Sequence, residues 1–289
     1  MSIRNHIFKY RLARSVWGNV LLVLFLLVIA AVMILPFVYV ISTALKPSNE
    51  LWLFPPRFIV RHPTMKNFTD LFSLMDDSWV PFSRYIFNTV FVTAVGTVGH
   101  ILIASLCAYP ISKYRFPGSE GFFNLVTATL MFSGAVTAIP SFIIVSKLGI
   151  LNSYLAVILP AFGLPLGLFV MKQFMDQTVN PAVLESAEMD GANELQKFLW
   201  LVMPMVKPAW LTLMIFSVQS LWALGNSPYI YSEQLKTLNF ALSQIQTAGV
   251  ARAGVGAAAA VLIMSVPLAI FILSQSSIIE TMSTSGMKD

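Results

Sequence analysis

The chain has 289 residues, of which 57% are hydrophobic and only 11% are charged. Soluble domains carry about 25% charged residues, so this composition excludes an ordinary soluble protein and indicates a membrane protein. The formal net charge of +5 does not indicate nucleic-acid binding, because the basic residues gather at the ends of apolar stretches, where they act as topology signals.

Six stretches without charged residues are long enough to cross a bilayer, which requires about 20 mainly apolar residues. Their apolar residues do not alternate with a period of two, so the pattern does not indicate a β-barrel. The chain is therefore predicted to be all-α, a polytopic membrane protein with six transmembrane helices. The predicted spans are residues 15–45, 85–112, 121–146, 148–171, 208–232 and 253–279.

The first apolar stretch is far longer than the apolar core of a secretory signal peptide, which spans about 7–15 residues. It is therefore expected to be a retained helix. Four basic residues precede it and only Lys46 follows it closely, which by the positive-inside rule places residues 1–14 in the cytoplasm. The four preceding residues are Arg4, Lys9, Arg11 and Arg14.

With six spans, the tail at residues 281–289 is also expected in the cytoplasm, and residues 46–84 form an extracellular segment. That segment contains Arg57, Arg61 and Lys66, which runs against the positive-inside rule. Long external segments contribute less to topology, so the predicted orientation stands.

Polar side chains inside the predicted spans are candidates for a substrate path, because polar groups in a membrane usually face protein or a water-filled cavity. An indole ring can stack on a sugar face, and amide groups can bond sugar hydroxyls. The candidates are Asn88, Gln219, Trp222 and Asn226. For each of them an interhelical hydrogen bond or core packing is the open alternative, and His100 is expected to be a packing residue.

Small residues recur within the spans, at Gly96 and Gly99, at Gly163 and Gly167, and at Gly254, Gly256 and residues 257–260. Such residues let membrane helices approach one another closely, because lipid supplies no hydrophobic force between helices. Close helix packing is therefore expected at these three groups.

A polar segment at residues 180–208, NPAVLESAEMDGANELQKFLWLVMPMVKP, interrupts the apolar pattern. Asn180 is a favourable N-cap and Pro181 suits the first helical position, so a helix is predicted to run from there to about Met189. Gly191 then supplies the left-handed residue that commonly ends a helix.

A second short helix is predicted directly after this turn. Asn193, followed three residues later by Gln196, forms a capping-box pattern. Pro204 and Pro208 then delimit the entry into the next span.

The first helix of this segment has a composition suited to a partner protein. Leu184 and Ala187 share one face, and the carboxylates of Glu185 and Glu188 lie elsewhere around the helix, so the small apolar face is predicted to enter a cleft on a partner. A helix lying on the bilayer would carry basic residues. Residues 180–196 contain four carboxylates and no Lys or Arg, so anionic lipid would repel them.

The sequence ESAEMDGANELQKFLWLVMP resembles the EAA loop of ABC importer permeases, whose pattern is E-A-A, then D-G-A, then L-P about a dozen residues later. The blocks SRYIFNTVFVTAV, CAYPISKYRFPG and KLGILNSYLAVILP resemble consecutive parts of the carbohydrate-uptake class, in particular the six-helix permease of maltose-type importers, and IIETMSTSGMKD resembles the tail of that subunit. The chain departs from the pattern at four positions, which are Ser186, Asn193, Met203 and Asp289.

The resemblance implies a type I ABC importer permease fold, with a transmembrane domain at residues 15–280 and a cytoplasmic EAA coupling loop at residues 177–207. The implied function is that of one permease in a binding-protein-dependent importer, forming half of the translocation path for a sugar or oligosaccharide in a bacterial or archaeal plasma membrane. The implied partners are a second, different permease, two copies of an ATPase subunit and an extracellular solute-binding protein.

The resemblance also implies which residues meet the ATPase subunits. In the coupling loop these are Glu185, Ser186, Ala187, Asp190, Gly191 and Pro204, and in the tail they are Gly286, Met287, Lys288 and Asp289. The chain has no G-x-x-x-x-G-K-[ST] sequence, so ATP and magnesium are expected in the partner ATPase subunits. No catalytic residue, metal site or cofactor is expected in this chain.

Two other classes of function remain as alternatives. A self-contained secondary transporter or channel would normally show intramembrane carboxylates or inverted repeats, and the predicted spans have no charged residue in their interiors. A membrane-embedded enzyme would need a motif such as H-E-x-x-H or G-x-S-x-G, and neither occurs. Within the ABC class, a permease for a solute other than a sugar shares the EAA loop and also stays open.

Overall fold

The computed structural model describes residues 16–76, 79–247 and 252–285, and within these ranges every regular element is a helix. The elements are α1 (Val16–Ala44), α2 (Ser48–Leu51), α3 (Lys66–Asp76), α4 (Phe82–Lys113), α5 (Ser119–Thr129), α6 (Gly134–Lys147), α7 (Leu155–Phe162), α8 (Pro165–Thr178), α9 (Pro181–Met189), α10 (Glu194–Gln196), the π-helix η2 (Lys197–Val202), α11 (Met203–Met205), α12 (Lys207–Trp222), the 3₁₀-helix η3 (Glu233–Leu235), α13 (Leu238–Thr247) and α14 (Ala253–Ser285). The predicted all-α class is confirmed.

Four of the described helical segments are long and apolar enough to cross a membrane. They are Trp17–Ala44, Phe82–Lys113, Leu155–Thr178 and Ala253–Leu273. Two further pairs of helices meet the same criteria if each bent pair is taken as one span, which brings the number within the described part of the chain to 6. The predicted number of six spans corresponds to this upper value.

The third predicted span, residues 121–146, is two helices and not one. α5 and α6 are bent by 113° relative to each other, and residues 130–133 lie between them outside the helices. The break ends at Ser133, whose backbone is extended, directly before Gly134. Pairs of Ser and Gly are frequent points of sharp helix bending, because they hold the helical backbone weakly.

The fourth and fifth predicted spans also have different bounds in the structure. The fourth begins later, at Leu155, because Gly149 and Asn152 adopt positive φ angles of 70° and 57° in a turn. The fifth was predicted to reach residue 232, but α12 ends at Trp222. The sequence GNSP at residues 225–228 is a cluster of turn-forming residues, and the count of apolar residues overlooked it.

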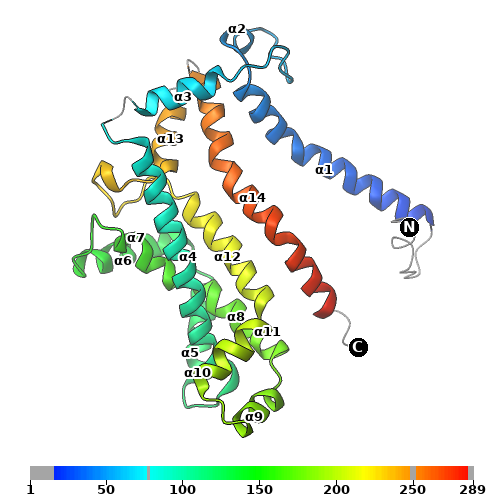
Figure 1. The fold of residues 1–289 in the computed structure, drawn as a ribbon, viewed down its shortest axis with the longest axis vertical. Coiled ribbons are helices and arrows are strands. Elements are labelled where there is room, and N and C mark those ends of the chain that lie inside the picture. Colours follow the sequence, from blue (N-terminus) through cyan, green and yellow to red (C-terminus); the bar gives the residue numbers. More distant parts are fainter. Residues whose placement is uncertain (1–15, 77–78, 248–251, 286–289) are drawn as a thin grey trace.

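Helix α4 lies at the centre of the bundle, and α7, α8 and α12 pack along it (Figure 1). Toward α9, Ala108 of α4, Met171 and Met175 of α8 and Leu213 of α12 are fully buried in one apolar cluster. A second apolar cluster at the opposite end joins α3, α13 and α14 to the start of α4. The central helix therefore connects both ends of the molecule.

Helix α1 diverges from the other long helices and packs mainly against α14 (Figure 1). It is apolar on all sides, and no residue in its most apolar stretch is buried. A helix that is apolar all round requires a nonaqueous environment. Lipid, a second protein chain or both must therefore cover α1.

The predicted close packing is confirmed at four of the six glycines. A Cβ atom would lie 2.6 Å from Leu221 at Gly96, 2.0 Å from Phe162 at Gly99, 2.1 Å from His100 at Gly167 and 2.5 Å from Asn67 at Gly254. At Gly256 the nearest atoms are 3.7 Å away, and at Gly163 the nearest atom is a backbone oxygen 3.9 Å away. Gly163 lies at the break between α7 and α8 and not in a helix contact.

We expect Gly167→Ala to lower the melting temperature of the protein purified in detergent. The new Cβ would lie 2.1 Å from His100 Nε2 and 3.0 Å from the Ala104 Cβ, and His100 cannot swing away freely because its Nδ1 lies 2.7 Å from Ser217 Oγ. Overpacking of this kind costs about 1–3 kcal/mol. Gly121→Ala is the control, since no atom lies within 4 Å of its Cβ position. Equal melting temperatures for the two variants would contradict tight packing at Gly167.

Candidate functional site

The coupling loop (177–207) contains α9, which begins with the predicted side-chain cap. Asn180 Oδ1 accepts a hydrogen bond of 3.0 Å from the backbone N–H of Ala182. Pro181 occupies the first helical position, where a missing N–H costs nothing. The helix ends at Met189, as its sequence pattern predicted.

The turn after α9 depends on Gly191, which has a φ of 81°. The N–H of Gly191 donates to the carbonyl of Glu188 at 2.9 Å, and the N–H of Ala192 donates to the carbonyl of Ala187 at 2.9 Å. These two bonds form a Schellman motif, which requires a left-handed residue at this position. No atom lies within 4 Å of the Cβ position of Gly191, so the requirement concerns backbone conformation and not space.

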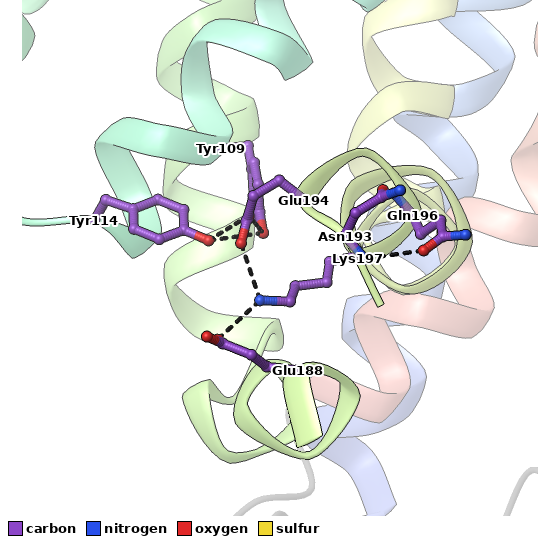
Figure 2. A network of polar contacts seen from close by, with 7 residues as sticks. All are labelled: Tyr109, Tyr114, Glu188, Asn193, Glu194, Gln196 and Lys197. Carbon is purple, nitrogen blue, oxygen red and sulfur yellow. Dashed lines mark hydrogen bonds and ion pairs between the residues drawn. The ribbon is translucent and has the colours of Figure 1, made fainter. Parts of the chain in front are cut away.

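Helix α10 is held by a complete capping box. Asn193 Oδ1 accepts from the Gln196 N–H at 2.9 Å, and Gln196 Oε1 accepts from the Asn193 N–H at 2.9 Å (Figure 2). Two backbone donors that would otherwise lack partners are satisfied reciprocally. The predicted second helix of the segment is therefore confirmed.

The chain passes from α10 to the next span through the π-helical turn η2 and the short helix α11. Pro204 lies inside α11 and Pro208 near the start of α12. A proline has no N–H to donate to the carbonyl four residues earlier, so helices bend near such positions. The segments Glu194–Met205 and Lys207–Trp222 are accordingly bent by 78°.

Lys197 lies at the centre of a polar network that joins α9 to α10 (Figure 2). Its Nζ lies 3.0 Å from Glu188 Oε2 and 2.9 Å from Glu194 Oε1. The Lys197 side chain is 3% exposed, whereas those of Glu188 and Glu194 are 74% and 59% exposed. Two carboxylates that keep contact with water thus compensate one buried ammonium group, which avoids the cost of an unpaired buried charge.

Two tyrosines connect this network to the central helix. The Tyr109 hydroxyl, from the last turn of α4, donates to Glu194 Oε2 at 3.0 Å, and the Tyr114 hydroxyl donates to the same oxygen (Figure 2). The Tyr109 ring also packs against Phe198 of η2, with 5.6 Å between the ring centroids. A displacement of α9 can therefore reach α4 through Lys197 and Glu194.

The hydrogen bond from Tyr114, followed by that from Lys197, lowers the pKa of Glu194 below its usual value of 4.5. The bonds to Glu194 and then Glu188 raise the pKa of Lys197 from 10.5 to about 12. The carboxylate's contribution to stability is complete above pH 4.5 and is lost as the pH falls through its lowered pKa. The ammonium's contribution is complete below pH 10.5 and is lost as the pH rises toward 12. Glu194 and Lys197 are therefore both ionised at neutral pH.

The exposed face of α9 differs from the predicted one. Ala187 is buried, and Leu184 packs against the chain's own apolar cluster. The predicted insertion of this face into a partner is therefore wrong, because the face already packs against the chain's own apolar cluster. Glu185 and Ser186 are exposed, and Met189 is 89% exposed.

A cavity of about 680 Å³ lies between α9, the end of α4 and the start of α5. Its lining carries four basic and four acidic side chains, which are Lys113, Arg115, Lys172, Lys197, Glu120, Asp176, Glu185 and Glu188. The exposed face of α9 forms one wall of this cavity, so a segment of a partner that contacts Glu185 also meets a mixed-charge surface.

The structure separates the four substrate-path candidates into two groups. Asn88 is fully buried, donates to the carbonyls of Gln234 and Lys236 at 2.8 Å each and accepts from the Tyr154 hydroxyl at 2.6 Å. Trp222 is 8% exposed, and its indole N–H donates to the carbonyl of Ile263. Both side chains are engaged within the chain, as the packing alternative predicted.

Gln219 and Asn226, the other two candidates, are exposed. Gln219 lies in the last turn of α12, and Asn226 lies in the loop after that helix. Both side chains are therefore accessible to a solute. The tail residues 286–289 lie outside the described residues.

The sequence pattern missed Lys197, Tyr109 and Tyr114. Lys197 had a usable signal, because it is the first basic residue after four carboxylates in the coupling loop. The tyrosines had none, since they lie 85 and 80 residues from Glu194 in the chain. Within the described residues, no group of three His, Cys, Asp or Glu side chains could hold a metal ion.

Residues 100–281 match the family model described as "Binding-protein-dependent transport system inner membrane component". The polygalacturonan/rhamnogalacturonan transport system permease protein YtcP of Bacillus subtilis (strain 168) is 34% identical over 217 residues, which cover 72% of this chain and 70% of YtcP.

Two solved structures share the fold. A chain of a bacterial ABC transporter involved in the import of the acidic polysaccharide alginate has a TM-score of 0.77 at 21% identity, covering 92% of this chain and 98% of that one. A chain of a bacterial alginate ABC transporter in complex with an alginate pentasaccharide-bound periplasmic protein has a TM-score of 0.60 at 19% identity, covering 90% and 96%.

Proposed function

The chain belongs to the family of binding-protein-dependent transport system inner membrane components, and from this premise we propose that it forms half of the translocation path for an oligosaccharide in an ATP-driven importer. The observation that carries the proposal is the family match over residues 100–281, which includes the coupling loop. The similarity to YtcP, a polygalacturonan/rhamnogalacturonan permease, supports a saccharide as the solute. As a member of this family, the chain is a membrane transport component.

The proposed orientation places both chain ends and the coupling loop in the cytoplasm. The basic residues before α1 support this orientation through the positive-inside rule. The direction of α14 supports it for the C-terminal end, because α14 extends from the end that carries α2 and α3 toward the end that carries α9 (Figure 1). Residues 46–84 then form the extracellular segment, in a bacterial or archaeal plasma membrane.

The proposed energy source is a pair of ATPase subunits that bind ATP and magnesium and dock on the coupling loop. Glu185, Ser186 and Asp190 are exposed on or beside α9 and suit contact with the ATPase. Ala187, Gly191 and Pro204 are proposed to determine the shape of the loop, through packing at Ala187 and backbone conformation at Gly191 and Pro204. When the ATPase subunits move, α9 transmits the displacement to α4 through the network around Lys197. The tail residues Gly286, Met287, Lys288 and Asp289 are proposed as a further ATPase contact, on the resemblance alone.

The proposed complex also contains a second, different permease and an extracellular solute-binding protein. The uncovered apolar surface of α1 supports a second membrane chain beside it. Gln219 and Asn226 are proposed as solute contacts of this subunit, because both are polar and exposed. Asn88 and Trp222 are proposed to act indirectly, because their hydrogen bonds fix the positions of the neighbouring segments at residues 234–236 and at Ile263.

Purification of the chain from its native membrane in mild detergent tests this proposal. Mass spectrometry is expected to identify a second permease and an ATPase with a phosphate-binding loop, in a ratio of one to one to two. Recovery of a homo-oligomer without an ATPase would contradict the proposal and would favour the self-contained transporter. Import of a solute other than a saccharide by the purified complex would contradict the substrate class alone.

A further inference from the structure

A cavity of about 580 Å³ lies at the outer end of α4, far from the coupling loop. Trp79, Pro81, Ser83, Arg84, Phe87 and Gln234 line it, together with Val80. Among the described residues that line it, Arg84 is the one charged side chain. The guanidinium of Arg84 therefore attracts an anion to the cavity.

Arg84 is oriented with part of its hydrogen-bonding capacity free for a ligand. Its Nε–H donates to the carbonyl of Gln234 at 3.2 Å, and its guanidinium lies 5.9 Å from the centre of the Phe87 ring. The side chain is exposed. A guanidinium held through Nε can direct its two terminal NH₂ groups at a carboxylate, which is the geometry of the strongest charge-assisted pairs.

One aromatic ring of the cavity offers a flat face to a ligand, and this is the indole of Trp79, which is 86% exposed. The Phe87 ring is stacked on Phe91, with 5.7 Å between the ring centroids, and has Arg84 over it, so it forms part of the apolar wall. Aromatic rings provide large apolar contact area with little loss of conformational freedom, and a sugar ring presents C–H groups that suit such faces. Ser83 and Gln234 add polar groups for hydroxyls.

The part of the wall that Gln234 contributes is fixed by contacts with buried side chains. The Asn88 amide holds the carbonyls of Gln234 and Lys236, and the Tyr85 hydroxyl donates to Glu233 at 2.9 Å. Glu233 in turn pairs with Lys236 at 2.8 Å, so its charge is compensated. Asn88 therefore positions the turn that anchors Arg84.

We propose that this cavity is a site for an acidic saccharide, in which Arg84 binds a uronic-acid carboxylate and Trp79 stacks on the sugar ring. The proposal rests on the proposed function and narrows its solute to acidic oligosaccharides received on the outer face. A neutral oligosaccharide would leave the guanidinium without an anionic partner, so the site discriminates by charge.

Uptake by the complete complex in proteoliposomes, with its binding protein present, tests the proposal. The probes are a trigalacturonate and its methyl ester, which keeps the shape and removes the charge. Arg84→Gln is expected to raise the KM for the acid about tenfold, as for the loss of a hydrogen-bonded charge pair, and to change the KM for the ester less than twofold. Arg84→Lys keeps the positive charge but loses the paired NH₂ donors of the guanidinium. Its KM for the acid is therefore expected to lie between those of the wild type and Arg84→Gln.

Binding to the purified chain supplies a second measurement. Trigalacturonate is expected to quench tryptophan fluorescence in the wild-type chain and to quench it much less in Trp79→Phe. Equal quenching in both proteins would overturn the placement of the sugar on Trp79.

The other outcomes separate this inference from the proposed function. Uptake of the acid with an unchanged KM in Arg84→Gln, or equal loss for acid and ester, overturns the site but leaves the importer. An Arg84 effect that depends on anionic lipid in the vesicles, and is equal for both probes, assigns the cavity to lipid headgroups and overturns the proposal. Failure of the wild-type complex to import any saccharide overturns the proposed function itself.

Discussion

Gly191→Val is expected to reduce solute uptake by at least about tenfold while the assembled complex still hydrolyses ATP. Gly191 has a φ of 81°, and a β-branched residue is strained there, since the left-handed conformation costs an ordinary residue about 1–2 kcal/mol. The chain would relieve this strain by unwinding the end of α9, which breaks the bonds to the carbonyls of Glu188 and Ala187. A cost of about 1.4 kcal/mol changes an equilibrium tenfold, so the ratio of correctly positioned to displaced α9 falls by at least about that factor.

Simultaneous measurement of ATP hydrolysis and uptake in proteoliposomes checks this prediction. Gly191→Asn is the matched control, because asparagine adopts the left-handed conformation readily, and it is expected to retain most of the uptake. Because no atom lies within 4 Å of the Cβ position, steric crowding cannot account for a difference between the two variants. Normal uptake by Gly191→Val at normal expression would contradict the role of this turn.

The local structure of the coupling loop could be predicted from sequence because short-range rules determine it. Asn180, Gly191 and the pair Asn193 and Gln196 each act within a few residues, through caps and turns whose geometry depends on residue type. All of these features are present. The composition was equally sufficient for the all-α class, since a bilayer leaves helices as the main way to satisfy the backbone.

The interior contacts of the loop could not be predicted, because they depend on the tertiary fold. Whether the Leu184 face meets a partner or the chain itself depends on where α8 and η2 lie. The bond between Tyr109 and Glu194 joins residues 85 positions apart. Periodicity identified apolar residues correctly but could not show which neighbour covers them.

The lengths of the spans were partly mispredicted for a related reason. Counting apolar residues detects a segment that prefers lipid, but it is insensitive to where the backbone leaves the helix. The turn at Ser133 and Gly134 lies within apolar sequence, as does the GNSP cluster after Trp222. The ends of the membrane helices are therefore determined by turn-forming residues inside the apolar runs, which a count of apolar residues does not detect.

Lys197→Met is expected to reduce uptake about tenfold with only a modest loss of melting temperature. Methionine fills the space of the lysine stem, but the ammonium that joins Glu188 to Glu194 is lost. The two carboxylates are 74% and 59% exposed, so water can solvate them and the fold survives. The variant loses the polar connection from α9 to α4. Coupling free energy between distant sites is carried by networks of this kind, so movement of α9 would no longer reach α4 by this route.

Two single variants identify which half of the network matters. Glu188→Gln weakens the contact of Lys197 with α9 alone, whereas Glu194→Gln weakens the contacts that both Lys197 and the two tyrosines make with α10. Both are expected to reproduce part of the loss. Lys207→Met is the matched control in the same loop, because Lys207 is exposed and belongs neither to the network nor to the cavity lining, and it is expected to change uptake less than twofold.

The measurement that decides is the ratio of solute imported to ATP hydrolysed. A structural role for Lys197 would lower uptake and ATP hydrolysis together, in proportion to the amount of assembled complex. A coupling role lowers the ratio while assembly stays normal, because the ATPase cycle continues without moving α4. An unchanged ratio in Lys197→Met would therefore assign the network to stability alone, and α9 would have to act on the membrane helices through the packing of Leu184 against the apolar cluster.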